Sequence, residues 1–150
     1  MSDKLTNNEI LDLAREVLAI ESRAVDALRS RLDDNFIAAC ELCKDVAGRI
    51  VVTGMGKSGH VSNKIAATLA STGTPALFVH PAEASHGDLG MITRKDAVVV
   101  LSNSGETREL AIVIRYCARH RIPMIGVASR STTVTCRPRP GSASATSSPM

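Results

Sequence analysis

The sequence predicts an α/β protein built on a doubly wound, flavodoxin-like parallel sheet that is flanked by helices. Three observations support this fold class. Four short and nearly all-apolar runs have the composition of strands that are covered on both faces. Amphipathic helical patterns lie between these runs, and about twenty residues separate one run from the next. Connections of that length, with helices in them, are typical of right-handed βαβ units.

The apolar spacing gives the order of the elements. From Asn8 to about Arg31, apolar residues recur at steps of three and four, which predicts a long amphipathic helix. A second helix is expected from Phe36 to about Val46, before Gly48. The expected strands are 49–53, 76–79, 97–101 and 124–128, and further helices are expected at 57–71 and 107–120.

The chain divides into three parts. Residues 1–47 are expected to hold N-terminal helices, and residues 48–133 the core of one domain. Residues 134–150 are predicted to be a disordered, low-complexity tail. Eleven of the last fifteen residues are Pro, Gly, Ser, Ala or Thr, which gives this segment too little apolar surface to offset its ordering entropy.

Composition narrows the class of protein. The chain has 150 residues, of which 44% are hydrophobic, and no apolar stretch approaches the ~18 residues of a membrane span. No secretory signal is visible, so a cytoplasmic protein is expected. The net charge of +3 falls to +1 without the last fifteen residues, and aromatic residues make up 2%. Nucleic-acid and membrane partners are therefore not expected.

The four cysteines are expected to be reduced thiols. Cys40 and Cys43 form a C-x-x-C pair, but no second pair of ligands and no strand-to-helix turn accompanies them. Helix packing is the favoured interpretation, and no metal site is predicted.

Two polar loops follow the first and third strands, and both lead into helices. They are Thr53-Gly-Met-Gly-Lys-Ser-Gly59 and Ser102-Asn-Ser-Gly-Glu-Thr107. In the strand order 2-1-3-4 they lie side by side at the carboxyl edge of the sheet, where doubly wound proteins bind ligands. Amide groups at a helix start, together with hydroxyls, favour a phosphate. The two loops therefore predict one anion pocket.

The glycines of the first loop have three other possible interpretations. Gly54, Gly56 and Gly59 match the dinucleotide fingerprint, but the acid that should bind ribose is replaced by His80, which argues against an NAD-dependent dehydrogenase. A Walker A loop fails because it needs glycine where Val51 stands. The glycines can also simply shape a tight strand-to-helix turn.

The second loop contains Ser102, Ser104, Gly105 and Thr107, whose hydroxyls and amides are expected to converge on one point. The structural alternative is a capping box at the start of the following helix, with Glu106 or Glu109 in its first turn. That alternative uses only one hydroxyl, so phosphate binding is favoured.

A polar segment between the second and third strands, His80 to Gly90, carries two of the four histidines. His80 and, farther along the chain, His120 are expected to be solvated. His86 is a candidate functional residue, because Asp88 could fix its tautomer next to the phosphate pocket. A hydrolase triad is not supported, since the chain has no G-x-S-x-G elbow.

The stretches VVTGMGKSGHVSNKIAATLASTGTPALFVHPAEASHGDLGMI and VVVLSNSGETREL resemble sugar isomerase (SIS) domains, and more narrowly the D-arabinose 5-phosphate isomerases of Gram-negative bacteria. The likeness runs from about Leu11 to about Thr133. It implies an SIS fold, no cofactor, a sugar-phosphate ligand, assembly into homodimers or homotetramers, and interconversion of D-ribulose 5-phosphate and D-arabinose 5-phosphate for lipopolysaccharide synthesis.

The same resemblance implies roles for individual residues. Lys57, His86 and Glu109 match active-site positions of the family, and Ser58, Ser102, Ser104 and Thr107 match its phosphate-binding positions. The reaction passes through an enediolate and needs a base and an oxyanion donor.

The family pattern continues past the fourth strand with a helix, a strand, a helix and two CBS modules. Here the likeness stops near Ser131 to Thr133, so the C-terminal part of the fold is expected to be missing. Two alternatives to the isomerase remain: a non-catalytic phosphosugar-binding module and an inactive fragment.

Overall fold

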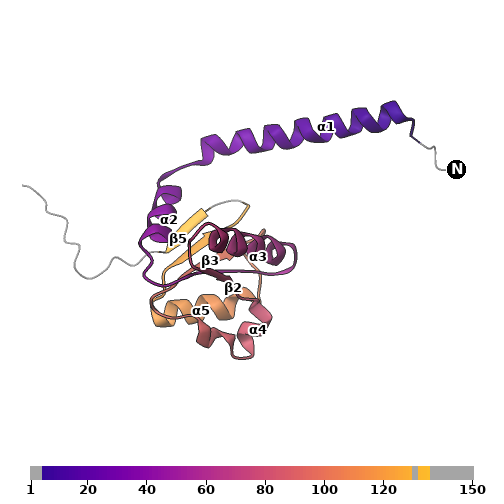
Figure 1. Ribbon diagram of the computed structural model, residues 1–150. Coiled ribbons are helices and arrows are strands. Elements are labelled where there is room, and N and C mark those ends of the chain that lie inside the picture. The colour runs from indigo at the N-terminus through magenta and orange to yellow at the C-terminus, as the bar shows by residue number, and fades with distance from the viewer. Residues whose placement is uncertain (1–4, 130–131, 136–150) are drawn as a thin grey trace, which may run out of the picture. The chain divides into compact units, whose positions relative to one another are not determined.

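The computed structural model describes residues 5–129 and 132–135, which form two compact units divided between Asp34 and Asn35 (Figure 1). The first unit contains helix α1 (Asn7–Asp26) and a 3-10 turn, η1 (Ala27–Arg31). A capping box starts α1: the Thr6 hydroxyl accepts the Glu9 amide at 3.3 Å, and the Glu9 carboxylate accepts the Thr6 amide at 2.7 Å. The predicted N-terminal helix is confirmed, with its last turn tightened to a 3-10 geometry.

The second unit is a five-stranded sheet with helices on both faces, in the order β2-β1-β3-β4-β5. Its elements are α2 (Asp34–Asp45), β1 (Ile50–Gly54), α3 (Gly56–Ser71), β2 (Ala76–Phe78), α4 (Pro81–Ser85), η2 (Asp88–Met91), β3 (Ala97–Leu101), α5 (Leu110–His120), β4 (Met124–Val127) and β5 (Thr132–Thr135). The first four strands are parallel, so the predicted order 2-1-3-4 is confirmed.

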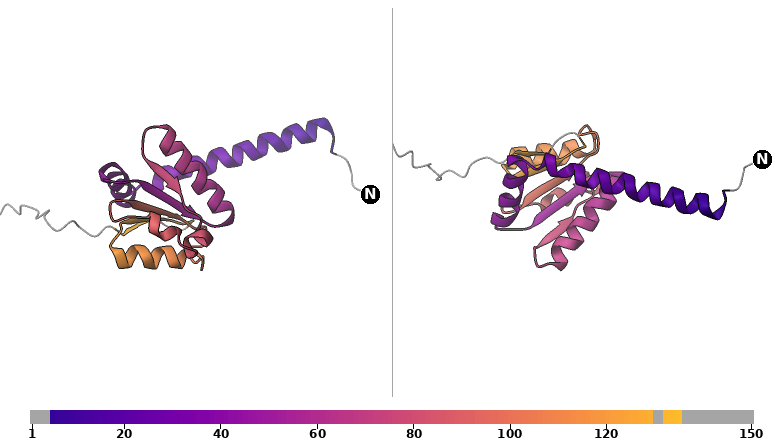
Figure 2. Two further views of the ribbon diagram at one scale, coloured as in Figure 1. Left: turned by 60° about the horizontal axis from the view of Figure 1, so that its bottom comes forward. Right: turned by 90° about the horizontal axis from the view of Figure 1, so that it is seen from above.

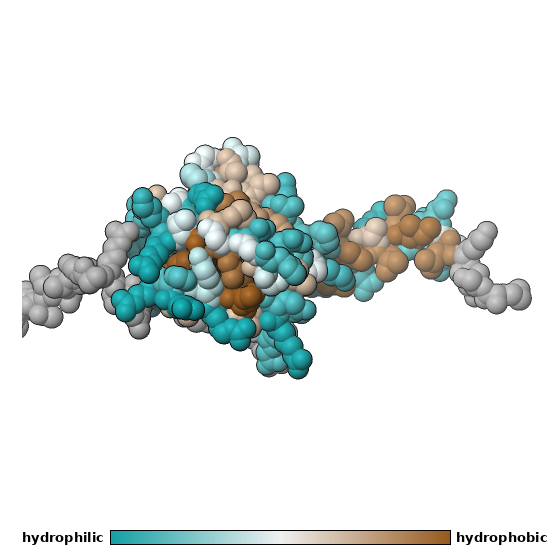
Figure 3. All heavy atoms as spheres, turned by 90° about the horizontal axis from the view of Figure 1, so that it is seen from below, coloured by the Kyte–Doolittle hydropathy of each residue, from teal (hydrophilic) through white to brown (hydrophobic). Residues whose placement is uncertain are grey.

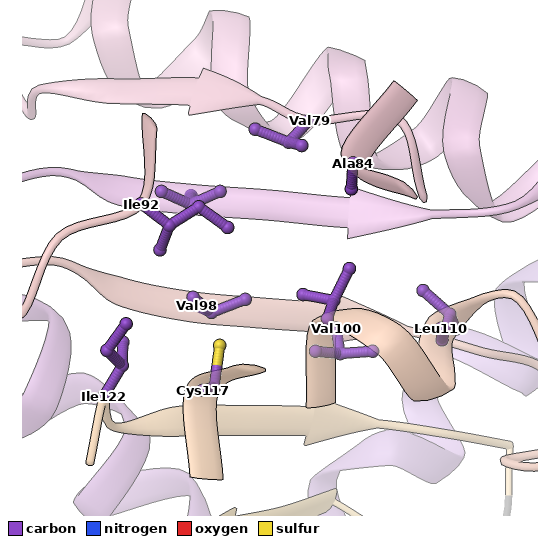
Figure 4. Packing of buried hydrophobic residues seen from close by; sticks show 10 residues of the cluster. Val79, Ala84, Ile92, Val98, Val100, Leu110, Cys117 and Ile122 are labelled. Atoms are coloured by element: carbon purple, nitrogen blue, oxygen red, sulfur yellow. The ribbon is translucent and has the colours of Figure 1, made fainter. Parts of the chain in front are cut away.

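Alternate residues of the central strands feed two apolar cores, one on each face of the sheet. Val51, Val98 and Val100 pack against α4 and α5, and Figure 4 shows the side chains of this core converging from those elements. Ile50 and Val52 pack on the opposite face against α2 and α3. Figure 2 shows the sheet between these helix layers. The double covering explains why the strands have almost no polar residues.

A buried carboxylate ties the sheet together at its amino-terminal edge. Asp96, 2% exposed, accepts the Arg49 amide at 2.8 Å and the Thr93 amide at 2.7 Å. Burial alone would raise the pKa of Asp96, but these amides, the Thr93 hydroxyl and the Arg49 guanidinium together hold it below its ordinary value. Asp96 therefore joins the starts of β1 and β3 while it stays charged.

Three expectations need correction. The helix expected from Thr107 begins at Leu110, because the preceding residues form a hydrogen-bonded turn. The polar segment 80–90, for which no helix was predicted, contains α4 and η2. The sheet is not purely parallel, since β5 returns antiparallel to β4.

Strand β5 also shortens the predicted tail. Disorder is expected at residues 134 and 135, but they pair with the free edge of β4, where Met124 is the partner of Thr135. The remainder of that predicted tail, 136–150, lies outside the described residues. Among the helices that the structure describes, none combines the length and apolar character needed to span a bilayer.

Candidate functional site

Two loops leave neighbouring strands at the carboxyl edge of the sheet. β1 and β3 pair in register as far as Gly54 and Leu101, the last residue of each strand. The glycine-rich loop therefore starts beside the Ser-Asn-Ser-Gly-Glu-Thr loop, as the sequence predicts. This edge is where open α/β sheets bind their ligands.

The glycines of the first loop permit a close approach of β1 and α3. A Cβ atom on Gly54 would lie 2.7 Å from the Ser62 hydroxyl, and one on Gly59 would lie 2.7 Å from the Gly54 carbonyl oxygen. Gly56 has φ of 53°, in the left-handed region that glycine adopts without strain. Residues 54–59 thus turn sharply from strand to helix at the edge of the sheet.

Helix α3 begins in this loop with free donors. Its N-cap is Met55, whose side chain caps nothing, and its first turn contains no acidic residue. The first amides of a helix have no partner within the helix, and the helix dipole adds positive charge there. Lys57, in the same turn, is exposed and adds a full positive charge. This end of α3 favours an anion.

The second loop is held by its own hydroxyl groups. Ser102 and Thr107 share a hydrogen bond of 2.8 Å, and the Ser102 hydroxyl also accepts the Gly105 amide at 3.0 Å. The Ser104 hydroxyl accepts the Glu106 amide at 3.1 Å. Gly105 has φ of 79°, which closes the turn. Three of the predicted phosphate-binding hydroxyls therefore also shape the loop.

The capping-box alternative for this loop is not what forms. Glu109 is the N-cap of α5, and its side chain makes no capping hydrogen bond. The fourth predicted hydroxyl, that of Ser58, lies half-buried in the first turn of α3. Ser58 and the Ser102–Thr107 turn therefore belong to loops that start at neighbouring strand ends.

Two hydrogen bonds that were not predicted from the sequence hold these loops. The buried Thr53 hydroxyl donates to the Val79 carbonyl at 2.8 Å and ties the end of β1 to β2. The Ser129 hydroxyl donates to the Asn103 carbonyl at 2.7 Å, so the segment after β4 supports the second loop. A polar residue at the end of an apolar strand was the available signal for Thr53.

The three candidate catalytic residues come from three helices. Lys57 lies in the first turn of α3, His86 is the C-cap of α4, and Glu109 is the N-cap of α5. All three are exposed, and their side chains make no hydrogen bond or ion pair with the residues that the structure describes. Asp88 makes no hydrogen bond or ion pair with His86, so the pair that was predicted to fix the tautomer of His86 is not formed.

The prediction that His80 is simply solvated is wrong. Its Nδ1 atom accepts the Ala82 amide at 3.3 Å and caps α4, and its ring stands edge-on to Phe78. His120 packs its ring against Tyr116, with ring centroids 4.4 Å apart. Both side chains are half-buried and structural.

The cysteines among the described residues are not arranged as a metal or redox site. Cys43 is half-buried and packs under the sheet, as the helix-packing interpretation predicts, whereas Cys40 is exposed. Burial raises the pKa of Cys43, and it raises the pKa of Cys117 to about 11. Within the described residues, no three His, Cys, Asp or Glu side chains gather as metal ligands would.

Comparison with known proteins agrees with this geometry. Residues 45–138 match the family model of the SIS domain. The chain is 54% identical over 121 residues to the arabinose 5-phosphate isomerase of Pseudomonas aeruginosa, which covers 81% of this chain and 37% of that protein. The corresponding protein of Escherichia coli K12 is 48% identical over 123 residues, 82% of this chain and 38% of the relative. The chain thus spans under two fifths of these curated relatives.

A solved structure of an E. coli CFT073 protein in complex with arabinose 5-phosphate superposes with a TM-score of 0.77 at 35% identity. The superposition covers 83% of this chain and 66% of that one. The sheet order, the paired loops and the family match over most of the described sheet unit agree with one another, and the chain therefore belongs to the SIS domain family.

Proposed function

We propose that the two loops bind the phosphate group of a pentose phosphate, and that the chain is an aldose–ketose isomerase acting on D-ribulose 5-phosphate and D-arabinose 5-phosphate. The observation that supports this proposal is that two sets of donors begin at neighbouring strand ends on one edge of the sheet. The uncapped start of α3 favours anions, and the Ser102–Thr107 turn begins at the neighbouring strand end.

The relatives named above supply the substrate class. Two of them carry the name arabinose 5-phosphate isomerase, and a related structure is a complex with arabinose 5-phosphate. Because the chain spans only part of the curated relatives, their activity comes to this chain as a proposal.

The chemistry assigns a role to each candidate side chain. Isomerisation moves a proton between adjacent carbons, so a base takes it from one carbon while a donor stabilises the enediolate oxygen. We assign acid–base work or ring opening to His86, charge stabilisation to Lys57 and a sugar contact to Glu109. Their exposure at the helix ends leaves all three side chains available to a ligand.

The experiment is an isotope-exchange assay with the full chain and ribulose 5-phosphate in deuterated water, followed by NMR. We expect arabinose 5-phosphate that carries deuterium at the carbon next to its carbonyl group. His86→Gln should slow its formation by about 10²–10⁴-fold. Lys57→Met should also slow it, whereas Lys64→Met, a matched exposed lysine two turns along α3, should not. Binding without isotope exchange would instead identify a non-catalytic binding module.

We also propose that the chain forms a homo-oligomer through α1. This helix of 20 residues buries none of them, and Ile10, Leu13, Val17 and Ile20 remain about half exposed along one stripe. Val17→Glu should shift the mass measured by light scattering to that of a monomer, and a monomeric wild type would overturn the proposal. A cytoplasmic enzyme that supplies lipopolysaccharide synthesis is the biological setting that we propose.

A further inference from the structure

An apolar groove lies beside the Ser102–Thr107 turn, between α5 and β4. It encloses about 320 Å³. Ser102, Gly105 and Thr107 of that turn form one part of its lining, and Leu110 and Ile114 of α5 form another together with Met124, Gly126 and Ala128 at β4. We call it the α5–β4 groove. Figure 3, which looks onto the face that carries α4 and α5, shows apolar side chains reaching the surface among polar ones.

One side of α5 is left without a partner. Val113 and Cys117 are fully buried against the sheet, but Ile114, the neighbour of Val113, is 41% exposed. Met124 packs on the edge of the same core and is only half-buried. In a sheet protein, exposed apolar side chains such as Ile114 are usually buried against the next helix on the same face.

The topology explains why the groove is open. α3 follows β1, α4 follows β2 and α5 follows β3, so each of these strands leads into a helix that covers a face of the sheet. After β4 the chain reaches β5 within five positions, from Val127 to Thr132, and turns antiparallel. Among the described residues, no helix follows β4. In a right-handed doubly wound fold, the helix after β4 would lie beside α5, over the groove.

We infer that the α5–β4 groove binds an amphipathic helix supplied in trans by a longer SIS-domain chain. The volume suits a few large apolar side chains rather than a whole helix, which matches anchor residues spaced at i, i+3 and i+4. The absence of a side chain on Gly126 permits a close approach to β4. The relatives are long enough to contain such a helix, because 63% of the P. aeruginosa protein lies outside the matched stretch, as the 37% coverage requires.

The groove shares Ser102, Gly105 and Thr107 with the proposed phosphate site, but helix binding requires no isomerisation and is measured without any sugar. The probe is the part of the P. aeruginosa relative that lies C-terminal to the matched stretch, labelled with a fluorophore and titrated with the full chain while anisotropy is recorded. We expect saturable binding that Ile114→Glu weakens at least tenfold. Val61→Glu, a matched change at a residue 52% exposed on α3, should leave the affinity unchanged.

Further measurements distinguish the proposed helix from other possible occupants of the groove. Circular dichroism and thermal melting check that both variants fold, and Ile114→Ser provides a milder change if the glutamate variant does not. The inference is overturned if no saturable binding is found, or if both glutamate variants bind equally. It is also overturned if a chain ending at Thr135 binds the probe much more tightly than the full chain does. That result would mean that residues 136–150 occupy the groove and compete with the probe. Self-association of the chain that Ile114→Glu abolishes would mean instead that a second copy of the chain occupies the groove, and would also overturn the inference.

Discussion

Gly59→Ala should separate the start of α3 from the end of β1. A Cβ atom at this position would lie 2.7 Å from the Gly54 carbonyl oxygen, and the nearest ordinary contact is 3.4 Å, so the two backbones must move apart by about 0.7 Å. Neither atom belongs to a flexible side chain. Overpacking of this kind costs about 1–3 kcal/mol of unfolding free energy. The same shift moves the α3 amides away from the Ser102–Thr107 turn, so phosphate binding should weaken as well.

Urea unfolding followed by circular dichroism measures the first effect, and calorimetric titration with inorganic phosphate measures the second. Gly90→Ala is the control, because an added Cβ there meets nothing within 4 Å. The control should change the unfolding free energy by less than about 0.5 kcal/mol. If Gly59→Ala is as stable as Gly90→Ala, or binds phosphate like the wild type, the argument that glycine is needed for close packing is refuted.

Other predictions follow from single contacts. Asp96→Asn should lower the unfolding free energy by about 1.5–3 kcal/mol, because a buried charged acceptor is lost. Since the pKa of Asp96 lies below its ordinary 3.8, the stability it provides is complete above that value and is lost as pH falls through the folded-state pKa. Acid titration of stability should therefore be flatter in Asp96→Asn, and parallel curves would argue against this role. Ser104→Ala should weaken ribulose 5-phosphate binding by about 1.5–3 kcal/mol in a calorimetric titration, and equal affinity would remove that serine from the site. Iodoacetamide with peptide mapping should label exposed Cys40 but leave Cys117, whose pKa is raised to about 11, unlabelled until the protein unfolds. Early labelling of Cys117 would show that its side of the core opens.

The strands were predictable from the sequence because burial on both faces removes polar residues. The run from Ala97 to Leu101 is found as β3 with the expected bounds, and the order 2-1-3-4 places the two loops together. The family match agrees with the predicted fold. The phosphate site stays a prediction, which rests on the glycines and hydroxyls at the strand ends.

The misses have local physical causes. α5 starts at Leu110 because the Ser102–Thr107 and Ser102–Gly105 hydrogen bonds compete with helical ones, and periodicity does not register such bonds. The cap formed by His80 is hard to predict because histidine is not among the usual N-cap residues, although its ring nitrogen accepts an amide as they do. β5 was not predicted because it has only four residues and lies beside a low-complexity stretch, so it has no recognisable strand pattern of its own.

The catalytic roles of Lys57 and Glu109 come from the resemblance, and His86 was in addition a candidate because of its neighbours in the sequence. Their long, exposed side chains make no hydrogen bond or ion pair within the described chain, and their positions at helix ends follow from where those helices begin and stop. Sequence pattern places them near the sheet edge, but a ligand contact is set by atoms outside the chain. All three roles remain predictions, and the His86 and Lys57 variants above test two of them.

We propose that the loops at the ends of β1 and β3 form one sugar-phosphate site. The decisive experiment is an NMR titration of the isotope-labelled full chain with ribulose 5-phosphate, with ribulose lacking the phosphate as the control. We expect saturable shifts in the amides of residues 54–59 and 102–107 together, at one affinity, with no such shifts in α2 and none with ribulose. Shifts confined to one loop, shifts elsewhere in the chain, or equal responses to ribulose and its phosphate would contradict it.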